Sequence, residues 1–104
     1  MKVRPVKKLD DGKTYEYCSA EEATHIWVNF PGPHGYQILP VRGDVSPKWN
    51  WDGNVDEPTI TPSIRTKAHD FVCHSYITKG KVQFLADCTH EYAGKTMNLL
   101  EVDI

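Results

Sequence analysis

The residues in this sequence best suited to chemistry are two cysteines and a histidine in its C-terminal third. They are Cys73, Cys88 and His90, spaced as Cys-x14-Cys-x-His. Two thiolates and an imidazole are donors that suit Zn²⁺, so we expect a zinc site here. His34 and His74 are alternatives for a fourth ligand, and ligation by His34 would close the site and make it structural. In the alternative interpretation, the cysteines are core residues and His90 only caps a turn.

A zinc ion with three protein ligands leaves a fourth position for water, which the ion converts into a nucleophile for hydrolysis. Hydrolysis also needs a carboxylate to move the proton, and Glu57, which precedes a proline, is the best candidate for this general base. Ser75 is expected on the same face as the metal ligands and is a second catalytic candidate. Three further hydroxyl groups are placed to stabilise an oxyanion or to orient Glu57: Thr59, Thr61 and Ser63.

A β-hairpin is expected to position the predicted ligands, because two β-rich runs within residues 71–88 flank Lys79-Gly80. With these two residues as the turn, the register places Cys73 opposite Ala86 and Phe71 opposite Cys88. One face then carries Phe71, Cys73, Ser75, Ile77, Val82, Phe84, Ala86 and Cys88. The other face carries Val72, His74, Tyr76, Gln83, Leu85 and Asp87. Two residues beyond Cys88, His90 is expected to project from the cysteine face.

Most of the remaining sequence is typical of strands. Residues 25–30, 36–42 and 95–104 are predicted strands. The turn-rich segment 43–62 contains two tryptophans, so we expect an anchored loop that lines the site. A capping-box pattern at Ser19 and Glu22 predicts one short helix over residues 20–24.

These elements predict a mainly β fold, a small α+β domain over residues 1–104. We expect a compact antiparallel sheet resembling a β-sandwich, with one short helix and the zinc site at a hairpin end.

The composition is that of a globular domain, with 104 residues of which 39% are hydrophobic and 25% charged. The net charge is −2 and the basic residues are scattered, so no nucleic-acid partner is expected. There is no apolar run of membrane-spanning length and no secretory signal, so we expect no membrane partner and a soluble cytoplasmic protein. In that reducing compartment the cysteines stay thiols, with Cys18 as the spare one.

Two blocks of the sequence carry a family resemblance over about residues 25–100. The first runs from Trp51-Asp-Gly to Glu57-Pro-Thr-x-x-Pro-Ser63, and the second runs from Cys73 through Cys88-Thr-His90 to Ala93-Gly-Lys-Thr96. These blocks resemble small phage and bacterial proteins that are often mislabelled as ammonia monooxygenase. Some members of that family are similar to predicted peptidases encoded beside bacterial ubiquitin-like conjugation enzymes. The resemblance implies cleavage of a ubiquitin-like modifier from its precursor or its target.

The sequence departs from this family at Phe30-Pro-Gly-Pro-His34. Many relatives have a Cys-Pro-Gly-Cys-like segment there, so a second, cysteine-based metal knuckle is not expected in this chain.

Together these features predict a zinc-dependent peptidase acting on a protein or peptide, with the extended substrate added to a strand edge beside the site. A non-catalytic binding module, in which zinc staples a phage or bacterial β-domain, is the alternative. A thiol enzyme that uses Cys73 or Cys88 with His90 is a third possibility.

Overall fold

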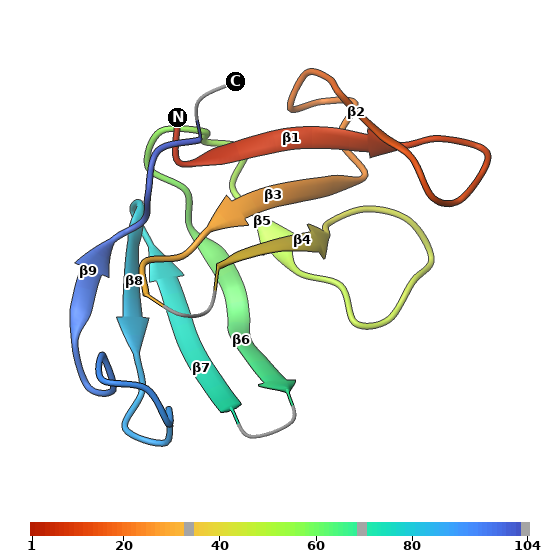
Figure 1. The fold of residues 1–104 in the computed structure, drawn as a ribbon. Helices are drawn as coiled ribbons and strands as arrows, with labels where there is room; N and C mark the ends of the chain where they lie inside the picture. The colour runs from red at the N-terminus through yellow and green to blue at the C-terminus, as the bar shows by residue number, and fades with distance from the viewer. Residues whose placement is uncertain (33–34, 69–70, 103–104) are drawn as a thin grey trace.

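A computed structural model of the chain describes residues 1–32, 35–68 and 71–102, which form two antiparallel sheets. Sheet A contains four strands in the order β2 (Tyr15–Tyr17), β1 (Val3–Lys8), β3 (His25–Asn29) and β4 (Tyr36–Pro40). Sheet B contains five strands in the order β5 (Asn50–Trp51), β6 (Ile60–Ala68), β7 (Phe71–Thr78), β8 (Lys81–Phe84) and β9 (Thr96–Asn98). The strands of sheet A run across the direction of the strands of sheet B (Figure 1).

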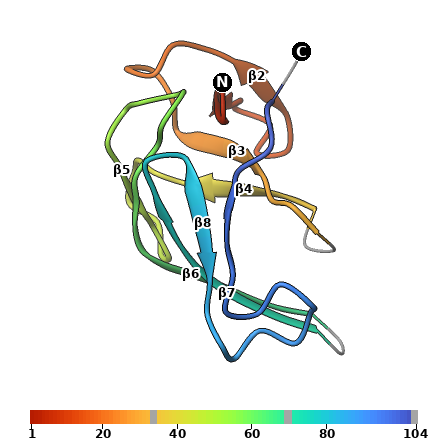
Figure 2. The ribbon, with the colours of Figure 1, turned by 90° about the vertical axis from the view of Figure 1, so that its left-hand side faces the viewer.

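Alternation of apolar and polar side chains explains why the two sheets pack face to face. In β8, Val82 and Phe84 are buried whereas Lys81 and Gln83 are exposed. The buried side chains of both sheets meet in one core cluster, whose members include Val3, Ile26, Leu39, Ile60, Ile64, Ile77 and Phe84. Burying each such side chain stabilises the fold by about 1.5–3 kcal/mol. The second view shows sheet A on one side of this core and β6, β7 and β8 on the other (Figure 2).

The predicted mainly β class is confirmed, but the predicted helix over residues 20–24 is wrong. Ser19 Oγ donates to Glu22 Oε1 at 3.0 Å and the Glu22 N–H donates to the Ser19 carbonyl at 3.1 Å, so the capping-box residues form an isolated turn. A segment this short gains too few hydrogen bonds to offset helix nucleation. The Thr24 N–H donates instead to the Val6 carbonyl of β1 at 3.0 Å. In the described parts of the chain we find no helix of the length and apolarity that crossing a membrane requires.

The predicted strands at residues 25–30 and 36–42 are confirmed as β3 and β4, whereas the predicted strand at residues 95–104 is shortened to β9. Strands β1 and β2 were not predicted from the sequence. Strand β1 contains Pro5 and two terminal lysines, and its pairing with β3 decides its conformation more than its own composition does. That residues 1–104 form one domain stays a prediction.

The β7–β8 hairpin has the predicted turn and the predicted register near that turn. Thr78 pairs with Lys81, and the ladder continues to Ser75 paired with Phe84. Lys79 and Gly80 both have positive φ, 49° and 77°, as a two-residue hairpin turn of type I′ requires.

Beyond Phe84 the register differs from the prediction. The chain leaves the ladder in a turn, in which the Cys88 N–H donates to the Leu85 carbonyl at 3.2 Å. The Thr89 N–H then donates to the Val72 carbonyl at 3.0 Å, so Cys88 lies beside Cys73 and is not opposite Phe71. The turn inserts an even number of residues, so Cys88 still shares the core face with Cys73 as predicted. Ala86, predicted on that face, instead lies exposed in the turn.

Candidate active site

His74, in the middle of β7, is hydrogen-bonded through both nitrogens of its imidazole ring. Nε2 lies 2.9 Å from Ser63 Oγ, and Nδ1 lies 3.1 Å from Asp87 Oδ2. An ionised carboxylate only accepts hydrogen bonds, so Nδ1 carries the hydrogen and donates it to Asp87, whereas Nε2 accepts the Ser63 hydroxyl hydrogen. The Ser63–His74–Asp87 triad lies on the outer face of sheet B. The His74 and Asp87 side chains are 24% and 53% exposed, so a substrate can reach them from solvent.

A bulge in β6 positions Ser63 beside His74. The pairs on either side of the bulge are Ile60 with Ile77 and Ile64 with Ser75. Three residues of β6, Thr61 to Ser63, therefore lie opposite the single residue Tyr76 of β7. Bulges re-aim side chains and occur often next to active sites. Here the bulge brings the Ser63 hydroxyl within hydrogen-bond reach of the imidazole.

The tryptophan loop anchors the backbone of the serine. The indole N–H of Trp49 donates to the Ser63 carbonyl at 3.3 Å. The indole N–H of Trp51 donates to the Asn54 carbonyl at 3.0 Å and closes the loop on itself. The loop that was predicted to line the site thus contacts the serine of the triad.

The backbone of His74 is bonded to the segment that carries Asp87. The His74 N–H donates to Cys88 Sγ at 3.2 Å, and the Cys88 thiol donates to the His74 carbonyl at 3.1 Å. The Leu85 N–H also donates to that carbonyl, at 2.9 Å. These bonds fix the distance between β7 and the turn that carries Asp87, so the pairing of the imidazole with the carboxylate is set by backbone as well as by side-chain contacts.

The hydrogen-bond order of the triad is the one needed to activate a serine hydroxyl. The imidazole Nε2 can take the Ser63 proton as the oxygen attacks a carbonyl carbon. Asp87 holds the ring in the tautomer that leaves Nε2 unprotonated, and it stabilises the imidazolium that forms. The triad therefore has the parts for acyl transfer through a covalent serine intermediate.

Cys73, Cys88 and His90 come together on the opposite, core face of the same strands. One ligand atom from each lies within 4.8 Å of the others, and both cysteines are buried. These residues form the thiol–imidazole cluster. Burial, followed by the neighbouring Cys88, raises the pKa of the Cys73 thiol to about 12. The cluster can hold a metal ion, and Cys73 is a protonated thiol unless an ion displaces its hydrogen.

The hydrogen bonds of His90 determine what metal binding would require. The Tyr92 N–H donates to His90 Nδ1 at 3.2 Å, so the hydrogen of the neutral ring is on Nε2, which lies 3.4 Å from Cys73 Sγ. A metal ligated by Nε2 needs the hydrogen on Nδ1 instead. The distances between the three ligand atoms and their donor types fit a soft divalent ion. Binding such an ion through Nε2 would break the hydrogen bond from the Tyr92 N–H to His90 Nδ1.

The cluster and the triad are adjacent along both segments. Cys73 precedes His74 in β7, where successive residues point to opposite faces, and Cys88 follows Asp87 in the segment after β8. The thiol–imidazole cluster thus lies directly behind the His74–Asp87 pair. Anything that tightens the cluster also restrains the two backbones that carry this pair.

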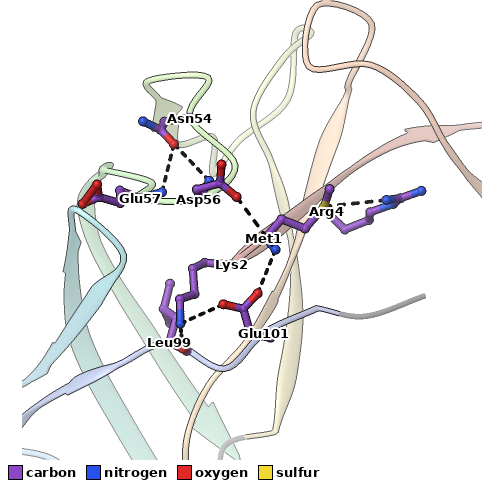
Figure 3. Close-up of polar contacts among 8 residues, drawn as sticks. All are labelled: Met1, Lys2, Arg4, Asn54, Asp56, Glu57, Leu99 and Glu101. Atoms are coloured by element: carbon purple, nitrogen blue, oxygen red, sulfur yellow. Dashed lines mark hydrogen bonds and ion pairs between the residues drawn. The ribbon is translucent and has the colours of Figure 1, made fainter.

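The structure does not bring Glu57 to this cluster. Glu57 lies at the far end of sheet B, where its Cα is 3.3 Å from the position that a Cβ on Gly80 would take. The Glu57 N–H donates to Asn54 Oδ1, beside Met1 and Lys2 (Figure 3). The β7–β8 turn and Cys73 are separated by five or more residues of strand, roughly 16 Å. Glu57 is therefore not beside the thiol–imidazole cluster, where a general base for a metal-bound water would have to lie.

Of the two remaining predicted site residues, Ser75 and His34, the structure describes only Ser75. Ser75 is fully buried on the core face, and its Oγ has no hydrogen-bond partner among the described residues. It is separated from the triad by the sheet itself. His34, the predicted additional ligand, lies outside the described residues.

The triad was not predicted from the sequence, although part of its signal was available. The hairpin register correctly assigned His74 and Asp87 to one face. Ser63 was considered only as a donor to an oxyanion or as a group that orients Glu57, because nothing in its local pattern predicts the bulge that aims it at His74. His74 was considered only as a rival metal ligand.

A family model described as bacterial ubiquitination-like system serine protease (BubE) matches residues 2–85. The chain belongs to the BubE family. No curated protein and no solved structure gives a significant match. The match to BubE spans Ser63 and His74 and ends two residues before Asp87.

Membership in BubE confirms the predicted tie to bacterial ubiquitin-like conjugation. It supports the predicted protease activity, but the description names a serine protease and not a metallopeptidase. The zinc-bound water and the Glu57 base are therefore not supported, whereas a serine bonded to a histidine is what a member of this class requires.

We expect Cys73 to be nearly inert to iodoacetamide in the folded, metal-free protein at neutral pH. The thiolate is the reactive species, and a pKa of about 12 leaves almost none of it. Alkylation should be about 100-fold slower than in the urea-unfolded chain, as followed by mass spectrometry of tryptic peptides. The partly exposed Cys18 serves as the internal control. Native labelling of Cys73 at the rate of Cys18 would contradict this assignment.

Proposed function

We propose that this chain is a serine protease that cleaves a peptide or isopeptide bond at the C-terminal tail of a ubiquitin-like protein. One observation carries the proposal: His74 is bonded to the Ser63 hydroxyl through one ring nitrogen and to the Asp87 carboxylate through the other. The BubE description supports both the serine class and the ubiquitin-like pathway of the substrate.

In the first half of the proposed reaction, Ser63 Oγ attacks the scissile carbonyl carbon while its proton moves to His74 Nε2. The resulting tetrahedral adduct collapses when His74 returns that proton to the departing amine. An ester then joins Ser63 to the acyl portion of the substrate, and the amine portion leaves. Asp87 accepts a hydrogen bond from Nδ1–H throughout and keeps Nε2 directed at the reacting atoms.

In the second half, a water molecule takes the place of the amine. His74 Nε2 removes one water proton as the oxygen attacks the ester carbonyl. Collapse of this second adduct returns the proton to Ser63 Oγ and releases the substrate tail as a carboxylic acid. His74 and Ser63 end in their starting states, so the cycle balances without a metal ion or a redox partner.

The proposal gives the thiol–imidazole cluster a structural function. Zn²⁺ is the ion that best suits two thiolates and one imidazole, and Cys73, Cys88 and His90 would hold it. On the core face, such an ion would staple the turn that carries Asp87 to β7. The Cys88 sulfur would keep its hydrogen bond from the His74 N–H, because a thiolate accepts that bond equally well.

Replacing Ser63 with alanine should abolish proteolysis, with a loss of at least about 10³-fold in kcat. Two matched variants, Ser75→Ala and Glu57→Gln, should cleave at the parent rate, because neither side chain contacts the triad. Cleavage of a ubiquitin-like fusion is followed by gel electrophoresis, with circular dichroism confirming the fold. Ser63→Ala activity equal to that of the parent would refute the assignment of the nucleophile.

The Asp87→Asn variant should lose about 10²- to 10⁴-fold in kcat, because an amide does not hold the ring tautomer or stabilise the imidazolium. Asp56→Asn, which changes an exposed carboxylate at the far end of sheet B, is the matched control and should be unaffected. Steady-state kinetics on the same fusion substrate measure both variants. Equal rates for Asp87→Asn and the parent would remove Asp87 from the mechanism.

Added zinc should raise the melting temperature by about 5–15 °C, because an ion that binds only the folded state stabilises it. His90→Gln should abolish this shift, while Ser63→Ala should show the parent shift. Differential scanning fluorimetry gives the shift, and elemental analysis gives the bound zinc. At a temperature where the chelated protein remains folded, its proteolytic rate should match that of the zinc-loaded protein. A rate that depends on zinc there would favour a catalytic metal instead.

A further inference from the structure

An open hollow of about 310 Å³ lies on the outer face of sheet B. Its lining residues come from β7, the turn after it, β8 and β9: Tyr76, Thr78, Lys79, Lys81, Gln83 and Thr96. We call this hollow the Tyr76 groove. The Tyr76 ring, the threonine methyl groups and the aliphatic stems of the lysines give it apolar walls, and the lysine ammonium groups give it charged ends.

The Tyr76 groove lies next to the triad on the outer face of β7. Tyr76 lies two residues beyond His74 on the same face of β7, and it is the residue opposite the bulge that holds Ser63. Neighbouring strands are about 4.8 Å apart, so the groove spans roughly 10–15 Å from Tyr76 across β8 to β9. An extended peptide advances about 3.3 Å per residue. The lining residues Tyr76 and Thr78 lie two and four residues beyond His74 in β7, roughly 7 and 13 Å along the strand. An extended substrate beside β7 would therefore bring residues two to four positions from the scissile bond over the groove.

The groove carries positive charge that the chain does not neutralise. Lys79 and Lys81 are exposed, and no carboxylate among the described residues lies within 4.0 Å of either ammonium group. Asp56 and Glu57 pack against the turn through their backbone and not through an ion pair with these lysines. The charge is thus available to a ligand.

The wall that carries this charge is held in place. The Lys79 N–H donates to Thr59 Oγ1 at 3.1 Å, and the Gly80 N–H donates to the Pro58 carbonyl at 2.9 Å. A Cβ on Gly80 would lie 3.2 Å from the Asp56 carbonyl oxygen, closer than an ordinary contact, and the positive φ of this residue also favours glycine. The turn is therefore fixed relative to β6, and the lysines extend from a rigid base.

We infer that the Tyr76 groove is a specificity site for an acidic side chain of the protein substrate, two to four residues from the bond cleaved at Ser63. This inference rests on the proposed protease function and adds a substrate class to it. The aspartate or glutamate carboxylate would lie between the two ammonium groups, with its methylene groups against the Tyr76 ring.

The test uses a fluorescence-quenched peptide that the full chain cleaves at one bond. Six derivatives carry a glutamate in place of glutamine at the second, third or fourth position on either side of that bond. We compare kcat/KM for the parent, for a Lys79→Gln/Lys81→Gln double variant and for a Lys7→Gln/Lys13→Gln control of equal charge change in β1 and in the loop between β1 and β2. The measured quantity is the ratio of the glutamate peptide to the glutamine peptide.

At one position or more, glutamate should raise kcat/KM about three- to tenfold in the parent and in the control, and the ratio should fall to near one in the double variant. The ratio should also shrink between 50 and 500 mM salt, because salt screens exposed charges. The inference is overturned if no position prefers glutamate, or if the preference survives in the double variant.

The Ser63→Ala variant distinguishes a failure of the groove inference from a failure of the proposed protease function. If cleavage is lost in Ser63→Ala but glutamate is not preferred, the protease function stands and the groove assignment falls. If Ser63→Ala cleaves like the parent, the nucleophile is wrong, and the groove is then tested by binding alone. Fluorescence anisotropy of the glutamate peptides on Ser63→Ala, with and without the lysine substitutions, supports the groove if the substitutions weaken binding and refutes it if they do not.

Discussion

The arrangement of this site depends on the hydrogen bonds that hold His74 at four points. The ring is bonded to Ser63 and Asp87, and the backbone N–H and carbonyl are both bonded to the Cys88 sulfur. Without these contacts, the rotamer of His74 alone would not determine the orientation of its imidazole ring. The segment after β8 supplies three of these contacts, from Asp87 and Cys88, and the bulge in β6 supplies the fourth, from Ser63, so the pairing of the strands specifies the geometry.

Sheet B separates two kinds of polar chemistry by the alternation of its side chains. The core face carries Cys73 and Cys88, where burial keeps the Cys73 thiol protonated. The outer face carries the hydroxyl, the imidazole and the carboxylate, where substrate and water have access. Because neighbouring residues face opposite sides, the two segments that carry the cysteines of the thiol–imidazole cluster also carry His74 and Asp87 of the triad.

The outer face of sheet B also places the triad near the Tyr76 groove. The bulge that aims Ser63 at His74 lies opposite Tyr76, and Tyr76 begins the groove that leads to Lys79 and Lys81. The β7–β8 turn is bonded to the segment that precedes β6, so the groove and the nucleophile share one rigid support. A substrate bound along this face would present its scissile bond at a fixed distance from the charged wall.

The sequence by itself determined the elements whose signals are local. Alternating apolar residues and the Lys79-Gly80 pair specified the β7–β8 hairpin, its register near the turn and the division of its residues between two faces. That division placed Cys73 with Cys88, and His74 with Asp87. The family resemblance indicated a peptidase of a ubiquitin-like pathway. The capping-box pattern led to a wrong prediction. Five residues with a suitable cap are too few to form a helix, and the Thr24 N–H bonds to strand β1 instead.

The tertiary structure alone decided which serine lies beside a histidine and which groups surround the cysteines. Ser63 reaches His74 because three residues of β6 occupy the space opposite one residue of β7, and no local pattern encodes that mismatch. Glu57 and Ser75 are plausible from residue type, but one lies at the far end of the sheet and the other faces the core. Catalytic contacts join residues distant in sequence, so their geometry depends on how strands pair and shift, which residue types and spacing do not fix.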